Sequence, residues 1–294
     1  MRLETPDPRA PKPPSRRAIA LSFFTAGYAL ALQPAAATAI ETDAQGLEIS
    51  EPTLPGEGGF ALPAYCARPQ RAGAHAAILV VNEVFGVHAY IKDVCRRLAK
   101  QGFVALAPDY FRRAGDPSIA PDFAAIAPIV AATPVAQVMG DTQGALSWLR
   151  AQPFVNGARL GVTGFCWGGA VVWSACAQFE GLKAGVAWYG RLAPPAPGAF
   201  GDEPHRRWPL DFAGELKCPV LGLYGGRDQG ISVASVEAMR RALAANGNPT
   251  GSQVILYPEA EHGFHADYRP SYNAHAAQDG WARMLAWFRE QGVR

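Results

Sequence analysis

Short apolar runs alternate with amphipathic stretches through most of the chain, and this alternation predicts its architecture. The apolar runs have the length and residue types of buried strands and lie at 76–81, 103–107, 159–163, 185–188, 220–224 and 253–257. Stretches with helical spacing lie at 89–101, 135–150, 168–179, 232–245 and 273–291. Strands that alternate with helices form βαβ units, so we expect an α/β fold with a mostly parallel central sheet and helices on both faces. In such a sheet, ligands bind at the carboxyl ends of the strands.

Two segments depart from this alternation. Residues 46–69 are rich in Gly, Pro and Glu with short apolar pieces, which is typical of edge strands or a hairpin. Residues 108–134 are rich in Pro, Ala and Asp and are long for a connection in a compact domain. We expect this second segment to be a lid or a wall of a pocket.

Length and composition indicate one large domain. The chain has 294 residues, of which 49% are hydrophobic, and α/β folds of roughly 200–250 residues routinely form a single domain. We therefore expect one domain over residues 40–294, preceded by an appendage over 1–39. The formal net charge is only +2 and no basic stripe with interleaved aromatic residues is present, so we expect the protein to bind no nucleic acid. We also expect a monomer.

The appendage has the organisation of an export signal. Ser15-Arg16-Arg17 precedes an uncharged run over 18–32 and a string of small residues over 35–39. The paired arginines resemble a twin-arginine signal, which exports folded proteins. We expect a mature chain that begins near Ile40 in the periplasm and meets a membrane only through this signal; an uncleaved anchor, or a cytoplasmic protein if the signal does not function, is the alternative.

The five cysteines do not have the spacing of a metal site. They are widely spread, with no CxxC pair, and their odd number leaves at least one thiol free: Cys66, Cys95, Cys166, Cys176 and Cys218. Two fall in predicted helices and Cys218 precedes a predicted strand, where a cysteine packs as a small apolar residue. We expect no metal.

Cys166 differs because it lies on a predicted strand-to-helix turn. In Gly164-Phe165-Cys166-Trp167-Gly168, the glycines on either side let the neighbouring chain pass without Cβ clashes. The turn displays the Cys166 side chain, and the N-terminus of the next helix favours its thiolate. Cys166 is therefore a candidate nucleophile; the alternative is a small buried hydrophobic residue.

A base and an acid follow in the chain. Asp228 comes directly after the predicted strand 220–224, and His262 follows the strand 253–257. The order nucleophile, acid, histidine is that of an α/β-hydrolase, so we expect these two residues to meet Cys166 at the sheet edge.

The other histidines are not preceded by a strand in this way. His265 has no accompanying carboxylate cluster, so we expect it to line a pocket or lie on the surface. No role is expected for the remaining four, which fall in predicted loops or at helix edges: His75, His88, His205 and His275.

Four ordered motifs resemble the dienelactone hydrolase (carboxymethylenebutenolidase) family. They are the segments 81–87 (VNEVFGV), 164–169 (GFCWGG), 225–228 (GGRD) and 262–264 (HGF), and the resemblance extends from about Glu48 to the C-terminus. It implies an α/β-hydrolase fold and a Cys166, His262, Asp228 triad that hydrolyses a lactone or ester through a thioester, with no cofactor. A broad carboxylesterase and a non-catalytic binding protein with this fold are the alternatives.

The resemblance also implies roles around the nucleophile. Glu83 is implied to hold the resting thiol neutral and to take its proton when substrate enters; the alternative is a solvated loop carboxylate. Backbone N–H groups of Val84 and Trp167 would stabilise the oxyanion.

Arginines are implied to bind a substrate carboxylate. The first family position falls on Arg113, with Arg112 as an alternate, and the second falls on Ala266, with Arg269 close by. This departure leaves open whether dienelactone is accepted; a lactone or ester that bears a carboxylate fits a bidentate arginine.

Overall fold

The structure is a computed structural model that describes residues 39–203 and 205–294. The predicted export signal therefore lies outside the described residues, except for its last position.

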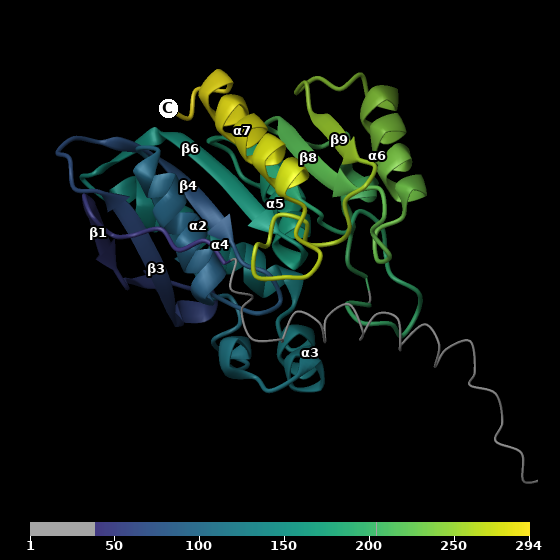
Figure 1. The fold of residues 1–294 in the computed structure, drawn as a ribbon, viewed down its shortest axis with the longest axis horizontal. Helices are drawn as coiled ribbons and strands as arrows, with labels where there is room; N and C mark the ends of the chain where they lie inside the picture. The colour runs from purple at the N-terminus through teal and green to yellow at the C-terminus, as the bar shows by residue number, and fades with distance from the viewer. Residues whose placement is uncertain (1–38, 204) are drawn as a thin grey trace, which may run out of the picture.

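A nine-stranded sheet forms the centre of the described chain, in the order β1-β3-β5-β4-β6-β7-β8-β9, with β2 paired to β3 (Figure 1). The first three strands are antiparallel to their neighbours: β1 (Leu47–Ser50), β2 (Thr53–Pro55) and β3 (Ala61–Pro69). The other six are parallel: β4 (His75–Val81), β5 (Val104–Pro108), β6 (Val155–Phe165), β7 (Leu182–Trp188), β8 (Val220–Gly225) and β9 (Gln253–Tyr257). The predicted α/β fold is confirmed, and 46–69 forms the expected edge strands.

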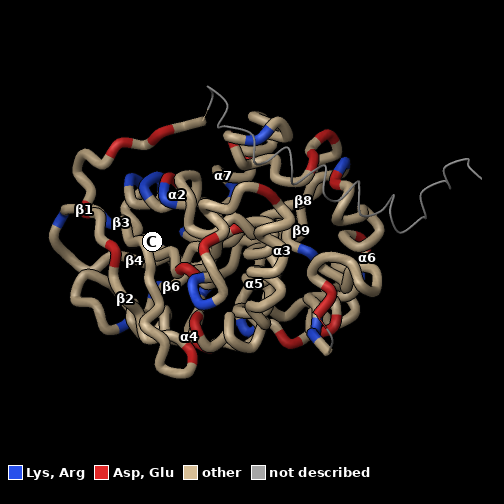
Figure 2. The backbone as a smooth tube through the Cα atoms, turned by 90° about the horizontal axis from the view of Figure 1, so that it is seen from below, with Lys and Arg blue, Asp and Glu red and all other residues tan. Residues whose placement is uncertain are grey.

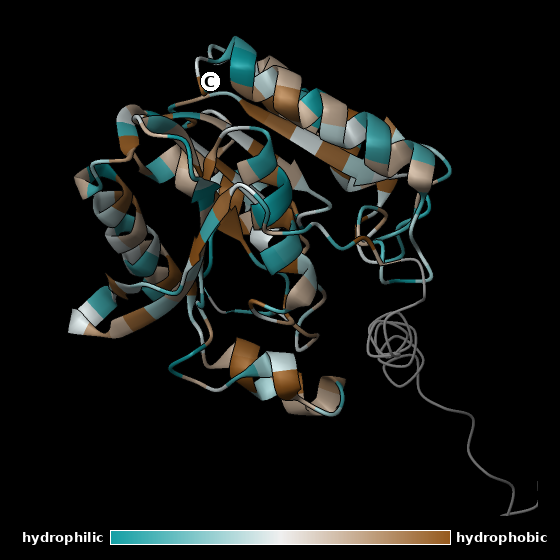
Figure 3. Ribbon diagram, turned by 60° about the vertical axis from the view of Figure 1, so that its left-hand side comes forward, coloured by the Kyte–Doolittle hydropathy of each residue, from teal (hydrophilic) through white to brown (hydrophobic). Residues whose placement is uncertain are grey.

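Helices cover both faces of this sheet. α2 (Ala89–Lys100) and α7 (Ala274–Glu290) lie on one face, and α4 (Val135–Ala151) and α5 (Trp167–Gln178) on the other, while α6 (Val233–Ala245) packs along β9 (Figures 1 and 3). The two faces are evident from the glycines of the sheet. A Cβ on Gly161 would meet Phe288 of α7, whereas one on Gly185 would meet Cys176 of α5.

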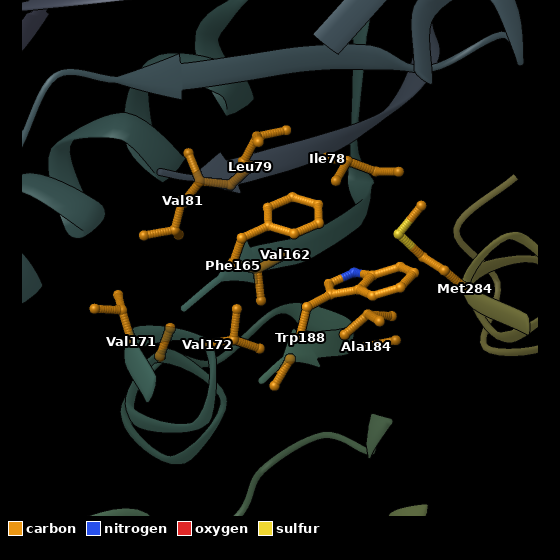
Figure 4. Close-up of a cluster of buried hydrophobic side chains, with 14 of the residues drawn as sticks. Ile78, Leu79, Val81, Val162, Phe165, Val171, Val172, Ala184, Trp188 and Met284 are labelled. Carbon is orange, nitrogen blue, oxygen red and sulfur yellow. The ribbon is translucent and has the colours of Figure 1, made fainter. Parts of the chain in front are cut away.

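Aromatic packing fixes the end of β6, where the candidate nucleophile lies. Phe165 stacks on Trp188 of β7 with their ring centroids 5.5 Å apart, and Met284 of α7 lies beside Trp188 (Figure 4). The indole N–H of Trp188 donates to the Thr163 hydroxyl at 3.2 Å. These side chains are fully buried or nearly so, and they hold the residue that precedes Cys166 rigidly in the core.

Residues 108–134, which were expected to form a lid or a wall of a pocket, contain regular structure. They contain the 3₁₀ turn η3 (Pro117–Ile119) and helix α3 (Phe123–Ala131). α3 buries three apolar side chains in a small cluster with the loop after β4 and with the residues after β5: Val84, Phe85, Phe111, Phe123, Ile126 and Val130. The segment therefore forms a packed wall against the Val84–Phe85 loop.

The first described residues lie along α2. The Thr42 amide donates to Asp93 at 2.6 Å, Arg96 donates to the Thr42 carbonyl at 2.7 Å, and Lys100 pairs with Asp43 at 2.6 Å.

Two other short 3₁₀ turns, η2 (Glu57–Gly59) and η4 (Pro209–Phe212), complete the elements. His75 opens β4 instead of lying in a loop, and its Nε2 is 2.9 Å from the Arg71 carbonyl.

Charge of both signs is spread around the described part of the molecule (Figure 2). Within that part, no single helix is long and apolar enough to cross a membrane; α3 and α4, which are bent by 79° at their junction, have the required length and composition only when they are counted together.

Candidate active site

Cys166 occupies a strained turn between β6 and α5. Its backbone has φ 56° and ψ −115°, and its N–H donates to the Trp188 carbonyl at 3.0 Å. The flanking glycines are needed for close packing, because a Cβ on Gly164 would lie 2.4 Å from the Gly168 carbonyl oxygen and one on Gly168 would lie 2.5 Å from that of Val81. The first turn of α5 therefore packs against the carboxyl end of β4.

The structure brings Cys166, His262 and Asp228 together. Cys166 Sγ is 3.1 Å from His262 Nε2, and His262 Nδ1 is 2.7 Å from Asp228 Oδ2. The other oxygen of Asp228 accepts the amides of Gly230 and Ile231 at 2.7 and 2.9 Å. The carboxylate is thus fixed from behind, and it orients the imidazole toward the sulfur.

Mutual attraction favours the ionised forms of the thiol and the imidazole. Burial raises the pKa of the Cys166 thiol, but the charge and hydrogen bond of His262 lower it more, so that the pKa falls below its ordinary value. Burial lowers the pKa of His262, and the charges of Asp228 and Cys166 raise it more, so that the pKa lies well above its ordinary value. His262 therefore favours the thiolate of Cys166, and Cys166 and Asp228 favour the imidazolium of His262.

Glu83 is fully buried, so the alternative of a solvated loop carboxylate is wrong. Its Oε2 accepts the Tyr268 hydroxyl at 2.7 Å, while Oε1 lies 4.0 Å from Arg269 Nη1. Burial raises the pKa of Glu83, but Arg269, His88 and Tyr268 together hold it at about 2. The resulting negative charge raises the pKa of the Cys166 thiol and so opposes His262.

Arg269 is the one predicted substrate arginine that the structure places in this cluster. It is 5% exposed, its guanidinium lies 5.1 Å from the Phe85 ring centroid, and neither Nε nor Nη2 donates a hydrogen bond to any described residue. Gly263, next to His262, has φ +74°, and a Cβ there would lie 2.3 Å from Arg269 Nη1. The chain beside the imidazole therefore packs directly on this guanidinium.

Arg113 and Arg112 lie elsewhere, which corrects their predicted role. Arg113 forms a bidentate pair with buried Asp141 of α4 at 2.7 and 2.8 Å and donates to the Glu57 carbonyl at 2.7 Å. Arg112 is 49% exposed and pairs with Asp116 at 3.0 Å. The donors of Arg113 are occupied in joining α4 to η2, so this residue is structural.

The two predicted oxyanion donors come from different segments: Trp167 directly follows Cys166, and Val84 lies in the loop after β4. Trp167 is the first residue of α5, where an amide N–H has no partner within its own helix. Val84 is buried in the tight turn that the Gly86 amide closes on the Glu83 carbonyl at 3.1 Å.

Sequence reasoning missed Tyr189, which follows β7 at the same sheet edge. Its φ is 38°, its buried hydroxyl has no hydrogen-bond partner among the described residues, and its ring meets His262 edge-on at 5.2 Å. Its position directly after a strand was the available signal. His88 and Tyr268, which contact Glu83, were also missed, because nothing local in the sequence relates them to it.

His265 was expected to line a pocket or to lie on the surface; it is buried in the aromatic core, so the surface alternative is wrong. Its Nδ1 is 2.5 Å from the Tyr90 hydroxyl, and it packs against Phe165 and Trp188. Burial, and then the charge of Arg97, lower its pKa to about 3. All five cysteines are buried and none forms a disulfide with another described residue, and no cluster of three His, Cys, Asp or Glu in the described residues could hold a metal.

The order of the strands and the turn at Cys166 between β6 and α5 define a protein of the α/β-hydrolase fold. Acylaminoacyl peptidase from Pyrococcus horikoshii shares this fold at 17% identity and a TM-score of 0.65, covering 84% of the chain and 42% of the peptidase. Residues 62–292 match the model of the dienelactone hydrolase family, and the chain belongs to that family. Family membership makes the protein a hydrolase.

Several relatives match over most of their length. A provisionally named carboxymethylenebutenolidase of Methylorubrum extorquens is 48% identical over 281 residues, which cover 95% of this chain and 94% of the relative. One from Escherichia coli K12 is 44% identical, covering 90% and 96%. The crystal structure of a provisionally named dienelactone hydrolase from Klebsiella pneumoniae has a TM-score of 0.76 at 43% identity and covers 83% of this chain and 98% of its own.

Proposed function

We propose that the protein hydrolyses a lactone or ester bond with Cys166 as nucleophile, His262 as general acid and base, and Asp228 as the group that orients the histidine. The observation that carries this proposal is the pair of contacts at 3.1 Å and 2.7 Å that joins the three side chains at a strained turn. Family membership supports the reaction class.

The chemistry proceeds in two halves. The Cys166 sulfur attacks the carbonyl carbon, and the N–H groups of Trp167 and Val84 stabilise the oxyanion. Collapse of this intermediate breaks the carbon–oxygen bond, His262 protonates the leaving oxygen, and a thioester remains. His262, which starts as the imidazolium and is neutral after this step, then removes a proton from water, and the water oxygen attacks the thioester. The acid product leaves, and the sulfur, released as a thiolate, regains its proton from Glu83.

Glu83 regulates the nucleophile in this scheme. Its buried negative charge opposes formation of the thiolate, which protects the sulfur from oxidation while no substrate is bound. When a substrate enters, the carboxylate takes the thiol proton. Replacement by Gln removes the charge and should therefore make Cys166 more reactive toward iodoacetamide at neutral pH.

Arg269 supports a substrate that bears a carboxylate. Its buried guanidinium has two nitrogens without partners among the described residues, and a carboxylate is the group that such a fork binds best. A provisionally named 2-oxo-3-(5-oxofuran-2-ylidene)propanoate lactonase of Bradyrhizobium is 30% identical over 234 residues, covering 80% of this chain and 91% of the relative. A thiolate is a good leaving group, so activated esters are favoured over amides.

The test uses purified protein and a panel of lactones and short esters, each with and without a carboxylate. Cys166→Ala should lower kcat/KM by at least about a thousandfold, whereas Cys66→Ala, which removes another buried thiol, should leave turnover unchanged. Retained turnover in the Cys166 variant would refute the assignment.

The same panel separates the alternatives. Equal rates with and without a carboxylate would indicate a broad carboxylesterase, and binding without turnover by the unaltered protein would indicate a non-catalytic protein.

A further inference from the structure

Two side chains outside the proposed triad form a hydrogen-bonded chain that ends on Glu83. The Tyr268 hydroxyl donates to Glu83 Oε2 at 2.7 Å, and His88 Nε2 lies 3.2 Å from that hydroxyl oxygen. Because the single hydroxyl proton of Tyr268 is used on the carboxylate, its oxygen accepts from His88, and Nε2 carries the proton. His88 Nε2 is also 3.6 Å from Glu83 Oε2, which is too long for a hydrogen bond but close enough for charge interaction.

His88 is held in place at the start of α2. Its backbone is extended, with φ −82° and ψ −178°, and its carbonyl accepts the Lys92 amide at 3.1 Å. The imidazole stacks on Phe85 at 5.9 Å and meets the Tyr268 ring edge-on at 5.3 Å. These two ring contacts favour the orientation in which Nε2 lies 3.2 Å from the Tyr268 hydroxyl oxygen.

The charged and titratable groups around His88 come from two parts of the chain. Glu83 and Tyr90 face it from its own loop and from α2. Tyr268 faces it from the loop before α7, and Arg269 lies behind, over the Tyr268 ring at 5.8 Å. Glu83 is the carboxylate of this group, so a donor on His88 or Tyr268 acts on Glu83.

We infer that His88 and Tyr268 are positioning residues, whose donor chain holds Oε2 of Glu83 and keeps the carboxylate ionised. Oε1, which accepts no hydrogen bond from the described residues, is left to take the thiol proton of Cys166. This inference rests on the proposed function, in which Glu83 controls the thiol.

The direction of the effect follows from electrostatics. Hydrogen-bond donors and cations favour the charged form of a carboxylate, and burial favours the neutral form. Removing either donor therefore raises the pKa of Glu83 from about 2, so that a larger fraction of the carboxylate is protonated at the acidic end of the pH range. A protonated Glu83 no longer opposes the thiolate. At low pH, Cys166 of either variant is therefore alkylated faster than Cys166 of the unaltered protein, and the difference between the two rates shrinks as the pH rises.

The experiment measures the rate of iodoacetamide alkylation of Cys166, located by mass spectrometry, from pH 5 to 9. In the full chain, Tyr268→Phe and His88→Leu should each raise the rate relative to the unaltered protein, and the ratio of the two rates should be largest at pH 5. His88→Gln retains an N–H donor at the position of Nε2 and should restore the original profile. His75→Gln, a change at a histidine that contacts the Arg71 carbonyl, is the matched control and should change nothing.

The same variants in a Glu83→Gln background decide the mechanism. If the two residues act through the charge of Glu83, their effects disappear there, and the rate stays at the raised level of Glu83→Gln alone. An equal effect in both backgrounds, or no effect in either, would overturn the inference. Hydrolysis retained by Cys166→Ala would instead refute the proposed function, and the alkylation measurements would remain a separate test of the coupling to Glu83.

Discussion

At the scale of the residue, Arg113 and Arg269 differ in how many hydrogen-bond acceptors surround their guanidinium groups. Nη1 and Nη2 of Arg113 donate to Asp141, and Nη2 also donates to the Glu57 carbonyl. Nε and Nη2 of Arg269 instead meet no acceptor among the described residues. A satisfied guanidinium stabilises the fold, and an unsatisfied one is available to a ligand. The acceptors around a guanidinium therefore indicate whether an arginine is structural or is a candidate for binding a ligand.

Arg113→Met should destabilise the protein without changing substrate preference. The substitution leaves the Asp141 carboxylate buried and unpaired, which typically lowers the free energy of unfolding by about 3–5 kcal/mol. Chemical denaturation measures this loss, and Arg112→Met, at an exposed ion pair, should lose less than about 1 kcal/mol. A selective loss of activity toward carboxylate-bearing substrates with unchanged stability would restore Arg113 as a binding residue.

The positions of the candidate site residues were predictable where a strand determines them. Cys166, Asp228 and His262 each follow an apolar run at the carboxyl edge, so their meeting required only the topology of a parallel sheet. The partners of Arg113 and His88 were not predictable in this way. Asp141 and Tyr268 lie 28 and 180 residues away, and no periodic pattern connects such pairs.

At the scale of the element, apolar periodicity located strands well and failed at α3. Strand β9 has the predicted bounds, Gln253–Tyr257, because its residue types and its length both indicate a strand. Helix α3 has an alanine-rich and proline-containing sequence whose helical state depends on packing against the Val84–Phe85 loop. Tertiary contacts of this kind override local propensity.

Helix α4 packs so closely against β2 that a glycine is required at position 144. A Cβ on Gly144 would lie 1.7 Å from the Pro55 carbonyl oxygen. We expect Gly144→Ala to lower the free energy of unfolding by about 1–3 kcal/mol, although alanine favours an isolated helix. The control is Gly157→Ala, whose added carbon would lie 3.3 Å from the flexible Arg150 side chain and should change the free energy of unfolding little in chemical denaturation. If both variants unfold with the same free energy, the backbone at Pro55 moves to admit the added carbon and the prediction is wrong.

At the scale of the whole molecule, the described N-terminal residues are joined to α2 by hydrogen bonds. The contacts of Thr42 and Asp43 begin just after the predicted cleavage position near Ile40. A mature chain that starts there retains every one of these contacts. The boundary predicted from the sequence is therefore compatible with the fold.

Export through the paired arginines remains a prediction with a direct measurement. The intact mass of the protein from a periplasmic fraction should correspond to a chain that starts near Ile40. Replacing Arg16 and Arg17 by Lys should retain the precursor in the cytoplasm, because a twin-arginine signal depends on both guanidinium groups. Recovery of the unaltered chain from soluble cytoplasm with Met1 intact would contradict the prediction.

Cys166, Asp228 and His262 come from distant parts of the chain. Cys166 and His262 are 96 positions apart, and Asp228 precedes His262 by 34. During synthesis the sulfur emerges well before the imidazole, and β8 and β9 must dock before the two can touch. Reactivity at Cys166 is thus a reporter of completed folding, and a truncated or stalled chain carries an unassisted thiol.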